Sequence, residues 1–450
     1  MYGNLIENWG AATQAEMRKS IVQTKQQVGP TLLSLKSGPG ARNEDGRLAG
    51  LEIPFKNGVP FGETALDVLG GTTSFEGFVP PPSDKMFVGL VQNGFTIEWE
   101  YFHNRDASKG HLPETKEDLK DQMMQTYYQH QNWYRIGTKT GALAVVAAGG
   151  GGGSGTIVCA GDNTARGRSK GNLRLAVSAS TTAGKRIMYQ SYTESTDTLT
   201  ATFYITARAS ATSMTIVVTD GGTVVAGDII VRYGHYKKVA YGLGYFHNQT
   251  GRIIQGASST TYPFLNARRV NGGGALITPT MMDTAKGANQ TRANNAMAGR
   301  RRMCHLTIGN YKTLSSYGYT LRTYNAEKGD ADTTFGLPNN FKDEDLEFVQ
   351  DAGFEDAYIY IRNKKSFFEY RQTELEKINP GNGSAQYVGT NSRGSTEFQD
   401  NFGESFNLAW DARGENGANK DGAGSPMDSV VIDNLEIPGN CELNEGIALV

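Results

Sequence analysis

The sequence predicts an α+β fold, and three observations support this prediction: one long amphipathic helix, alternating strands before and after it, and a stretch rich in Thr, Ser, Val and Gly. The chain has 450 residues, 38% of them hydrophobic, which is enough for a substantial core. A formal net charge of -2 excludes the basic balance of a protein whose whole surface meets nucleic acid. Any such contact is therefore expected to be local.

The helix is predicted to run from Pro113 to about Arg135, with Gly137 after its end. Proline first, acidic residues in the first turns, a basic residue in the last turn and glycine beyond it are the expected asymmetry of a helix. One stripe of this helix carries Leu119, Met123, Tyr127 and Tyr134. Such a long helix is expected to serve as a spine.

A hairpin is predicted in KMFVGLVQNGFTIEWEYF, with Asn93-Gly94 as its tight turn. After the turn, polar residues alternate with Phe95, Ile97, Trp99 and Tyr101, so one face of the ribbon is apolar. A ribbon of two strands is marginal alone and needs a surface to lie on.

Strands are also predicted later in the chain. LTATFYIT and TSMTIVVTDGGTVVAGDIIVRYG indicate a small β module, and MCHLTIGNYKTLSSYG indicates a strand, a turn and a helix. Further strands are expected in AYIYIRN, SFFEYRQ and DSVVIDNLEIP. In the turn-rich segment LGYFHNQTGRIIQGASSTTYPFL, residues 262–265 offer apolar area to the subunit's own core or to a neighbour's.

Few residues suggest chemistry. The run GGGGGSGT lacks the lysine of a phosphate-binding loop, and the histidines lack metal-binding spacing. Cys304 and His305 are adjacent, but neighbours on a strand point to opposite faces. The acidic clusters lack the spacing of a calcium loop and are interpreted as solvated loops. We therefore predict no catalytic residue, no cofactor and no metal site, and expect that the chain is not an enzyme.

The compartment is suggested by the cysteines and the N-terminus. Three cysteines far apart in sequence favour a reducing environment. The N-terminus lacks a continuous apolar region, and no stretch approaches the roughly 18 apolar residues of a membrane span. We expect a protein that is used without secretion and has no membrane partner.

One basic cluster stands out, formed by Arg292, Arg300, Arg301 and Arg302. The planar fork of donors on a guanidinium group matches the geometry of both phosphate and carboxylate. The cluster is therefore predicted to face either DNA or an acidic patch on a neighbouring subunit, and the sequence leaves both open.

In order, these elements resemble the major capsid proteins of tailed bacteriophages, which have the Hong Kong 97-type fold. The resemblance covers about residues 50 to 440, and three stretches carry it: RIGTKTGALAVV, VVAGDIIVRYG followed by AYGLGYFHNQTGRIIQG, and MCHLTIGNYKTLSSYG. Relatives often carry an Asp-Arg pair where this chain has Ser258-Ser259, which puts the ion pair made there in doubt.

The resemblance implies a division of the chain. In this division the ribbon at 85–101 lies over an adjacent subunit, so that Phe95, Ile97, Trp99 and Tyr101 become inter-subunit contacts. The implied parts are an N-terminal arm (1–50), an extended loop (51–112), a peripheral domain with the spine helix (113–149), an inserted β module (150–235), connecting strands of the peripheral and axial domains (236–289), an axial domain (290–400) and C-terminal strands of the peripheral domain (401–450).

The implied function is self-assembly, through hexamers and pentamers, into the icosahedral head shell around double-stranded DNA, which is contacted without sequence specificity. Scaffold, portal and cement proteins are the implied partners, and the implied location is the virion after assembly in the bacterial cytoplasm. Two alternatives stay open. One is a phage tail-tube or head-decoration protein built on the β module, and the other is a β-rich glycan-binding protein, suggested by 21 Tyr and 4 Trp.

Overall fold

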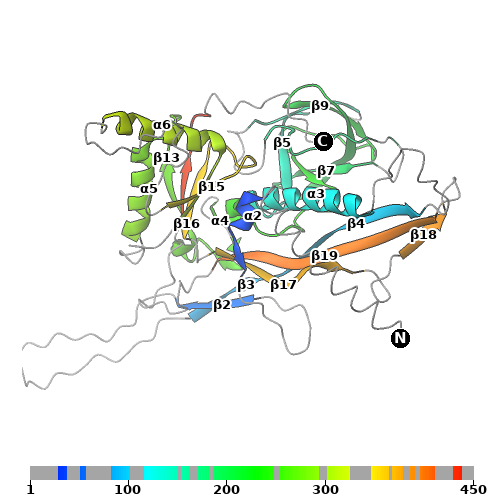
Figure 1. Ribbon diagram of the computed structural model, residues 1–450, viewed down its shortest axis with the longest axis horizontal. Coiled ribbons are helices and arrows are strands. Elements are labelled where there is room, and N and C mark those ends of the chain that lie inside the picture. Colours follow the sequence, from blue (N-terminus) through cyan, green and yellow to red (C-terminus); the bar gives the residue numbers. More distant parts are fainter. Residues whose placement is uncertain are drawn as a thin grey trace, which may run out of the picture.

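The chain is mixed α+β, as the sequence predicts, with more strand than helix. Figure 1 shows the arrangement: a long helix lies between a long sheet and a closed barrel, a second sheet with two helices stands at one end, and a ribbon of two strands lies below. The computed structural model describes residues 29–37, 51–56, 83–101, 116–149, 154–161, 170–179, 181, 186–247, 253–292, 302–324, 346–363, 367–378, 386–390, 396–410 and 429–437.

The predicted spine helix is confirmed as α3, Lys116–Ile136. The start expected at Pro113 lies outside the described residues. Tyr127 and Tyr134 of the predicted stripe are buried, and Met123 is partly buried. The helix ends where the backbone N–H of Gly137 bonds to the carbonyl of Trp133 at 3.0 Å. Its apolar side therefore holds the helix against the sheet below it.

That long sheet is built around strand β19, Thr396–Trp410. On one side β19 pairs with β4, Val91–Tyr101, along the full length of β4. On the other side it pairs with β17, Phe367–Lys377, and β18, Gln386–Thr390, and β17 also pairs with the short β1, Lys36–Ser37. The sheet thus joins segments from both ends of the chain.

The predicted hairpin turn at Asn93-Gly94 is wrong. Both residues lie inside β4, where they pair with Glu404 and Gly403 of β19. The ribbon forms instead from β3, Ser83–Val88, and β2, Leu51–Lys56. Long-range strand pairing overrides the local turn preference. Gly94 instead lets the backbone of β4 lie close to that of β19, because a Cβ at this position would lie 2.0 Å from the carbonyl oxygen of Phe402.

This close approach yields a prediction. We expect Gly94→Ala to push β4 away from β19 and to lower the free energy of unfolding by at least about 2 kcal/mol, because backbone atoms must move to admit the methyl group. Denaturant unfolding measures the loss. The control is Gly155→Ala in β6, where a Cβ meets nothing within 4 Å. Equal stability of the two variants would contradict the close contact between Gly94 and the backbone of β19.

The predicted β strands of the middle region close into a barrel in the order β10-β5-β6-β9-β8-β7. Its interior contains Leu143, Ile157, Phe203 and Ile216, all nearly inaccessible to solvent. Closure leaves no open sheet edge. The strands are β5 (Ala142–Ala148), β6 (Gly155–Cys159), β7 (Met188–Thr193), β8 (Thr198–Arg208), β9 (Ser213–Val218) and β10 (Ile229–Arg232), so the barrel includes a strand before residue 150.

The second sheet has the order β13-β20-β16-β14-β15. Its strands are β13 (Arg268–Asn271), β20 (Ser429–Asp433), β16 (Ile359–Asn363), β14 (Arg302–Leu306) and β15 (Leu346–Gln350). The predicted strand, turn and helix are confirmed as β14 and α6, Ile308–Tyr324. Helix α5, Pro279–Arg292, was not predicted, although Thr278, whose hydroxyl accepts the N–H of Met281 at 3.3 Å, and Pro279 are a recognisable start signal.

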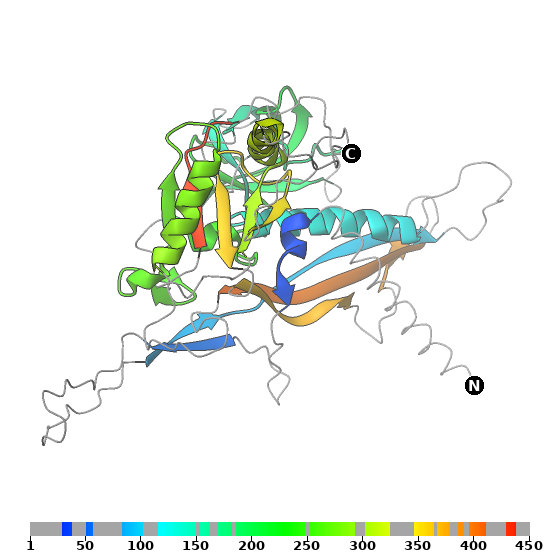
Figure 2. The same ribbon diagram turned by 60° about the vertical axis from the view of Figure 1, so that its left-hand side comes forward.

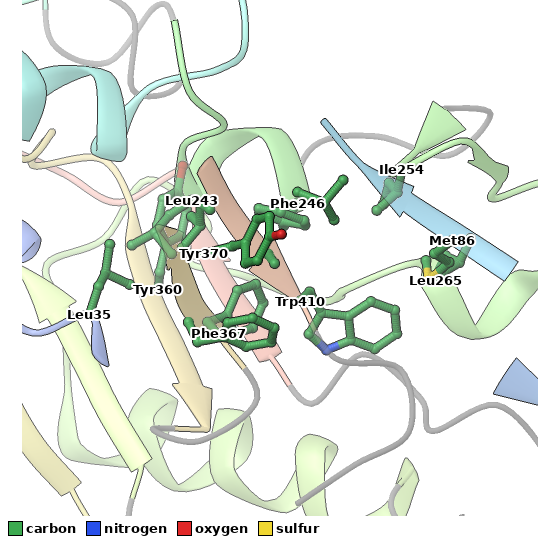
Figure 3. Close-up of a cluster of buried hydrophobic side chains, with 14 of the residues drawn as sticks. Leu35, Met86, Leu243, Phe246, Ile254, Leu265, Tyr360, Phe367, Tyr370 and Trp410 are labelled. Atoms are coloured by element: carbon green, nitrogen blue, oxygen red, sulfur yellow. The ribbon is translucent and has the colours of Figure 1, made fainter. Parts of the chain in front are cut away.

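The turn-rich segment closes the main core. It forms α4 (Leu243–His247), strands β11 (Ile253–Ile254) and β12 (Ala257–Ser258), and a short helix at Pro263–Leu265. Gln255 and Gly256 have φ of 49° and 85°, which makes a tight primed turn. Figure 3 shows Ile254, Leu265 and Met86 gathered beside Trp410. Leu265 therefore serves the subunit's own core.

Candidate assembly surfaces

The apolar face of β4 packs on the chain's own helix. Ile97 is 3% exposed, and the ring of Phe95 lies 5.4 Å from that of Tyr127 and 5.1 Å from that of Phe402, centroid to centroid. These partners belong to α3 and β19 of the same subunit, so Phe95 and Ile97 pack within their own subunit. The side chains of Trp99 and Tyr101 lie outside the described part, and their contact with a neighbour stays a prediction.

Beneath α3 lies a network of buried charges that the sequence analysis missed. Glu369 Oε1 accepts a hydrogen bond from Arg135 Nη2, and its Oε2 accepts one from Arg371 Nη2, both at 2.7 Å. Arg371 Nη1 continues to Glu404 Oε2 at 2.7 Å, and the hydroxyl of Tyr127 donates to Glu404 Oε1 at 2.7 Å. Burial, and next the Glu404 charge, raise the pKa of Tyr127, so its hydroxyl stays a donor. The network fixes α3 on the sheet.

A second set of buried contacts lies in the loop between β15 and β16, residues 351–358; we call its residues 351–356 the hub loop. Asp351 Oδ2 accepts hydrogen bonds from Thr31 Oγ1 at 2.6 Å and from Asn132 Nδ2 at 2.7 Å. Thr31 belongs to helix α2, Pro30–Leu33, and Asn132 belongs to α3. Asp351 Oδ1 also accepts the backbone N–H of Gly353 at 2.8 Å. One buried carboxylate thus joins α2, α3 and the second sheet.

The barrel region is attached to the same loop. Lys170 Nζ lies 3.2 Å from Asp356 Oδ2, and Arg174 Nη2 donates to the carbonyl of Gly353 at 2.7 Å. The hydroxyl of Thr307, at the start of α6, also donates to Asp356. The hub loop therefore sets the barrel and the second sheet at a fixed mutual position.

The β2–β3 ribbon has one buried face and one open face. Ile53, Met86 and Val88 are inaccessible to solvent, whereas Phe87, between the last two, is 53% exposed. The backbone N–H of Phe87 donates to the carbonyl of Gln255 at 2.7 Å, which continues the ribbon into the β11–β12 hairpin, where Ile253 is 65% exposed. Figure 2 shows the ribbon at the edge of the molecule. We call Phe87 and Ile253 the ribbon patch.

The basic cluster is described only in part. Arg302 lies in β14 and is 2% exposed, so its side chain is not on the surface of the subunit. Arg292 is the last residue of α5 and its side chain lies outside the described part, as do Arg300 and Arg301 altogether. The predicted contact of these three arginines with phosphate or carboxylate stays a prediction.

Cys304 and His305 point to opposite faces of β14, as strand alternation predicts. Cys304 packs among apolar residues of the second sheet, whereas His305 Nε2 accepts a hydrogen bond from Arg362 Nε at 2.9 Å. Burial, and next the Arg362 charge, hold the pKa of His305 well below its ordinary value. The neutral imidazole thus serves as a buried acceptor for a structural arginine.

The described part of the chain offers neither a metal-binding group nor a membrane-spanning helix. Among the residues that the structure describes, no three His, Cys, Asp or Glu side chains form a group that could hold a metal ion. Within the same residues, no helix combines the length and apolar content needed to cross a membrane. The acidic clusters at 330–332, 343–345 and 411–421 and the glycines at 150–153 lie outside the described part.

Comparison with known proteins gives no family model that matches and no matching curated protein. Solved structures do match. The cyanophage A-1(L) capsid asymmetric unit has a TM-score of 0.43 at 10% identity, over 91% of this chain and 93% of that one. A structure of Mycobacterium phage Cain has a TM-score of 0.41 at 6% identity, over 91% and 90%. The capsid of an empty GTA particle has a TM-score of 0.38 at 7% identity, over 91% and 89%. Phage capsid chains are thus among the structures to which this chain is similar, as the sequence resemblance predicts.

Proposed function

We propose that this chain is the major capsid protein of a tailed bacteriophage, whose copies form an icosahedral head shell around double-stranded DNA. The observation that carries the proposal is the β2–β3 ribbon, whose open face exposes Phe87 beside the ion pair of Glu52 and Lys85. A ribbon of two strands is marginal in water, and the ribbon patch exposes large apolar side chains at the edge of the molecule. A neighbouring subunit supplies the surface that such a ribbon needs.

The interior of the subunit supports the same proposal. The charge network under α3 and the hub loop hold the parts of an elongated molecule in one arrangement. A shell repeats the same contacts many times, so a rigid subunit converts modest affinity at each contact into large collective stability. A fixed internal geometry is therefore the property that a shell subunit needs most.

The partners follow from the same proposal. Copies form hexamers and pentamers, and scaffold, portal and cement proteins complete the head. Arg292, Arg300 and Arg301 meet either DNA phosphates or an acidic patch of the next subunit. A formal charge of -2 supports local rather than global contact with DNA.

The test is assembly of a ribbon variant. The wild-type chain, expressed with the neighbouring genes of its source genome, is expected to give closed shells with five- and six-fold capsomers in electron micrographs. Phe87→Ser combined with Ile253→Ser is expected to leave mainly unassembled subunits, because both changes remove exposed apolar area from the ribbon patch. Since both side chains are exposed, the denaturant midpoint should stay within error of wild type.

The matched control is Leu199→Ser combined with Val225→Ser, which removes two similarly exposed apolar side chains from the barrel region. This control should still form shells. Shells from the ribbon variant would contradict the role of the ribbon patch. Tubes from the wild-type chain would favour a tail protein, and monodisperse monomers under all conditions would overturn the capsid proposal.

A further inference from the structure

Two residues of the turn-rich segment bind the β2–β3 ribbon at two separate points. The backbone N–H of Phe87 donates to the carbonyl of Gln255 at 2.7 Å, and three residues earlier on β3 the carboxylate of Asp84 accepts the hydroxyl of Tyr262. Three residues of a strand span roughly 10 Å. Two attachment points at this separation define a direction, whereas a single point would let the ribbon turn about it. We call Gln255 and Tyr262 the ribbon clamp.

The apolar contacts of the ribbon hold it on the core without fixing its direction. Met86 lies beside Ile254 and Leu265 (Figure 3), and Ile53 and Val88 belong to the same buried cluster. Apolar burial is non-directional, and an unbranched methionine side chain adapts to small shifts of its neighbours. A hydrogen bond, in contrast, weakens steeply when its angle departs from a straight line. The ribbon clamp therefore supplies the angular restraint that the apolar contacts lack.

Gln255 has a backbone conformation that a glutamine rarely adopts. Its φ of 49° lies in the left-handed region, which favours glycine or asparagine in a tight primed turn. Its buried side chain uses both polar atoms of the amide: Nε2 donates to the carbonyl of Trp410 at 3.2 Å, and Oε1 accepts the N–H of Trp410 at 2.8 Å. Backbone strain of this kind persists where the surrounding structure requires that residue. Gln255 thus connects the ribbon to the end of β19, which a glycine could not do.

Tyr262 is held in place by its own segment. Its backbone N–H donates to the carbonyl of Ser258 at 2.9 Å, and the short helix Pro263–Leu265 follows it directly, with Leu265 buried. The hydroxyl of Tyr262 holds the pKa of Asp84 below its ordinary value, as expected for a carboxylate that accepts a hydrogen bond. This bond is exposed to water, so its loss should cost the whole fold little. Its effect is therefore on the ribbon rather than on the stability of the subunit.

We propose that the ribbon clamp fixes the direction of the ribbon in the unassembled subunit, so that the ribbon patch meets the next copy in one orientation. This inference rests on the proposed function, in which a neighbouring subunit receives the ribbon. Binding costs less when the bound geometry already exists before the partners meet. A closed shell repeats one contact in every copy, so an error in its angle is repeated as well. Gln255 and Tyr262 are thus positioning residues, which act on the neighbour through Phe87 and Asp84.

The first test is hydrogen exchange of the full chain before assembly. Tyr262→Phe removes only the hydroxyl, and exchange of the backbone amides of residues 83–88 is expected to become about three- to tenfold faster, the range that corresponds to one net hydrogen bond. The denaturant midpoint should stay within error of wild type, because the lost bond is exposed. A merely structural role for Tyr262 would instead lower the midpoint and raise exchange throughout the chain, which would overturn the proposal.

Three further variants complete the exchange experiment. Tyr236→Phe is the matched control, because it removes another exposed tyrosine–aspartate hydrogen bond, to Asp197 in the barrel region, and exchange at 83–88 should equal wild type. In an Asp84→Ala background, Tyr262→Phe should have no additional effect, since its partner is already absent. Gln255→Asn suits the left-handed turn but is one methylene too short to keep both bonds to Trp410, so exchange at 83–88 should rise, with circular dichroism as the check on folding.

The second test is assembly with the neighbouring genes of the source genome. Wild type and Tyr236→Phe are expected to give uniform closed shells, whereas Tyr262→Phe, which leaves the ribbon patch intact, should give shells of mixed size and incomplete shells. The clamp proposal is overturned if Tyr262→Phe leaves exchange at 83–88 unchanged, or if exchange rises but the shells stay uniform. If the wild-type chain forms no shell while Tyr262→Phe still speeds exchange at 83–88, the clamp is supported in the unassembled subunit and the proposed function fails.

Discussion

Replacement of Glu369 by alanine is expected to lower the free energy of unfolding by about 3–5 kcal/mol, the range found when one partner of a buried ion pair is removed. Glu369 is the shared anion of Arg135 and Arg371, and the Arg135 side chain is 0% exposed. Without this carboxylate, Arg135 keeps the ring of Phe406, 4.4 Å from its guanidinium carbon, but no anion that the described contacts show. Denaturant unfolding followed by tryptophan fluorescence measures the loss.

The control for this prediction is the exposed ion pair between Glu52 and Lys85, which has the same 2.7 Å distance. Its side chains are 58% and 66% exposed, so water replaces the lost contact and Glu52→Ala should leave stability within error. Glu369→Gln, which keeps the size and one acceptor, should fall between the two. A loss for Glu369→Ala as small as that for Glu52→Ala would show that the network does not hold α3 on the sheet.

Replacement of Asp351 by alanine is expected to lower the free energy of unfolding by at least about 3 kcal/mol, because hydrogen bonds to charged groups contribute roughly 1.5–3 kcal/mol each. Asp351 is 3% exposed, and its carboxylate accepts hydrogen bonds from Thr31, Asn132 and Gly353. The change should also free α2, so limited proteolysis near residue 30 should become faster before global unfolding.

Asp220 provides the matched control, because its carboxylate also accepts the backbone N–H two residues on, from Gly222 at 3.0 Å. Asp351 makes the same local contact with Gly353 and adds the two long-range ones. Asp220 also interacts with Thr202, but it is exposed to water, so Asp220→Ala should change stability by only about 1 kcal/mol, well below the loss expected for Asp351→Ala. Similar losses in the two variants would contradict the joining role of the hub loop.

Local signals explain what the sequence could predict. Helix α3 and the β14–α6 unit were predicted because helical periodicity, helix end signals and strand alternation depend only on residues that are close together in the sequence. Asn93-Gly94 shows the limit. Its turn preference is local, but pairing with Gly403 and Glu404, more than 300 positions along the chain, provides an entire strand of hydrogen bonds and prevails.

The internal contacts of the candidate site had no sequence signal. Arg135, Glu369 and Glu404 look like surface charges in the sequence, since charged residues are mostly exposed. Only the fold brings these three residues together, and no spacing in the sequence indicates that they are in contact. Arg302 shows the converse case, because its neighbours in sequence suggest an exposed basic patch, whereas it is buried on β14, which lies between β16 and β15 in the second sheet.

The chain joins its beginning to its end, and this sets the order of its folding. Thr31 meets Asp351 across 320 positions, and β4 pairs with β19 near the opposite end of the chain. On a ribosome, β4 must therefore wait for most of the chain to emerge, whereas the barrel, complete by residue 232, can close early. The ribbon, whose base rests on the same core as Trp410, gains its support late. A nascent chain thus acquires a competent ribbon only when synthesis is nearly finished, which delays assembly until subunits are whole.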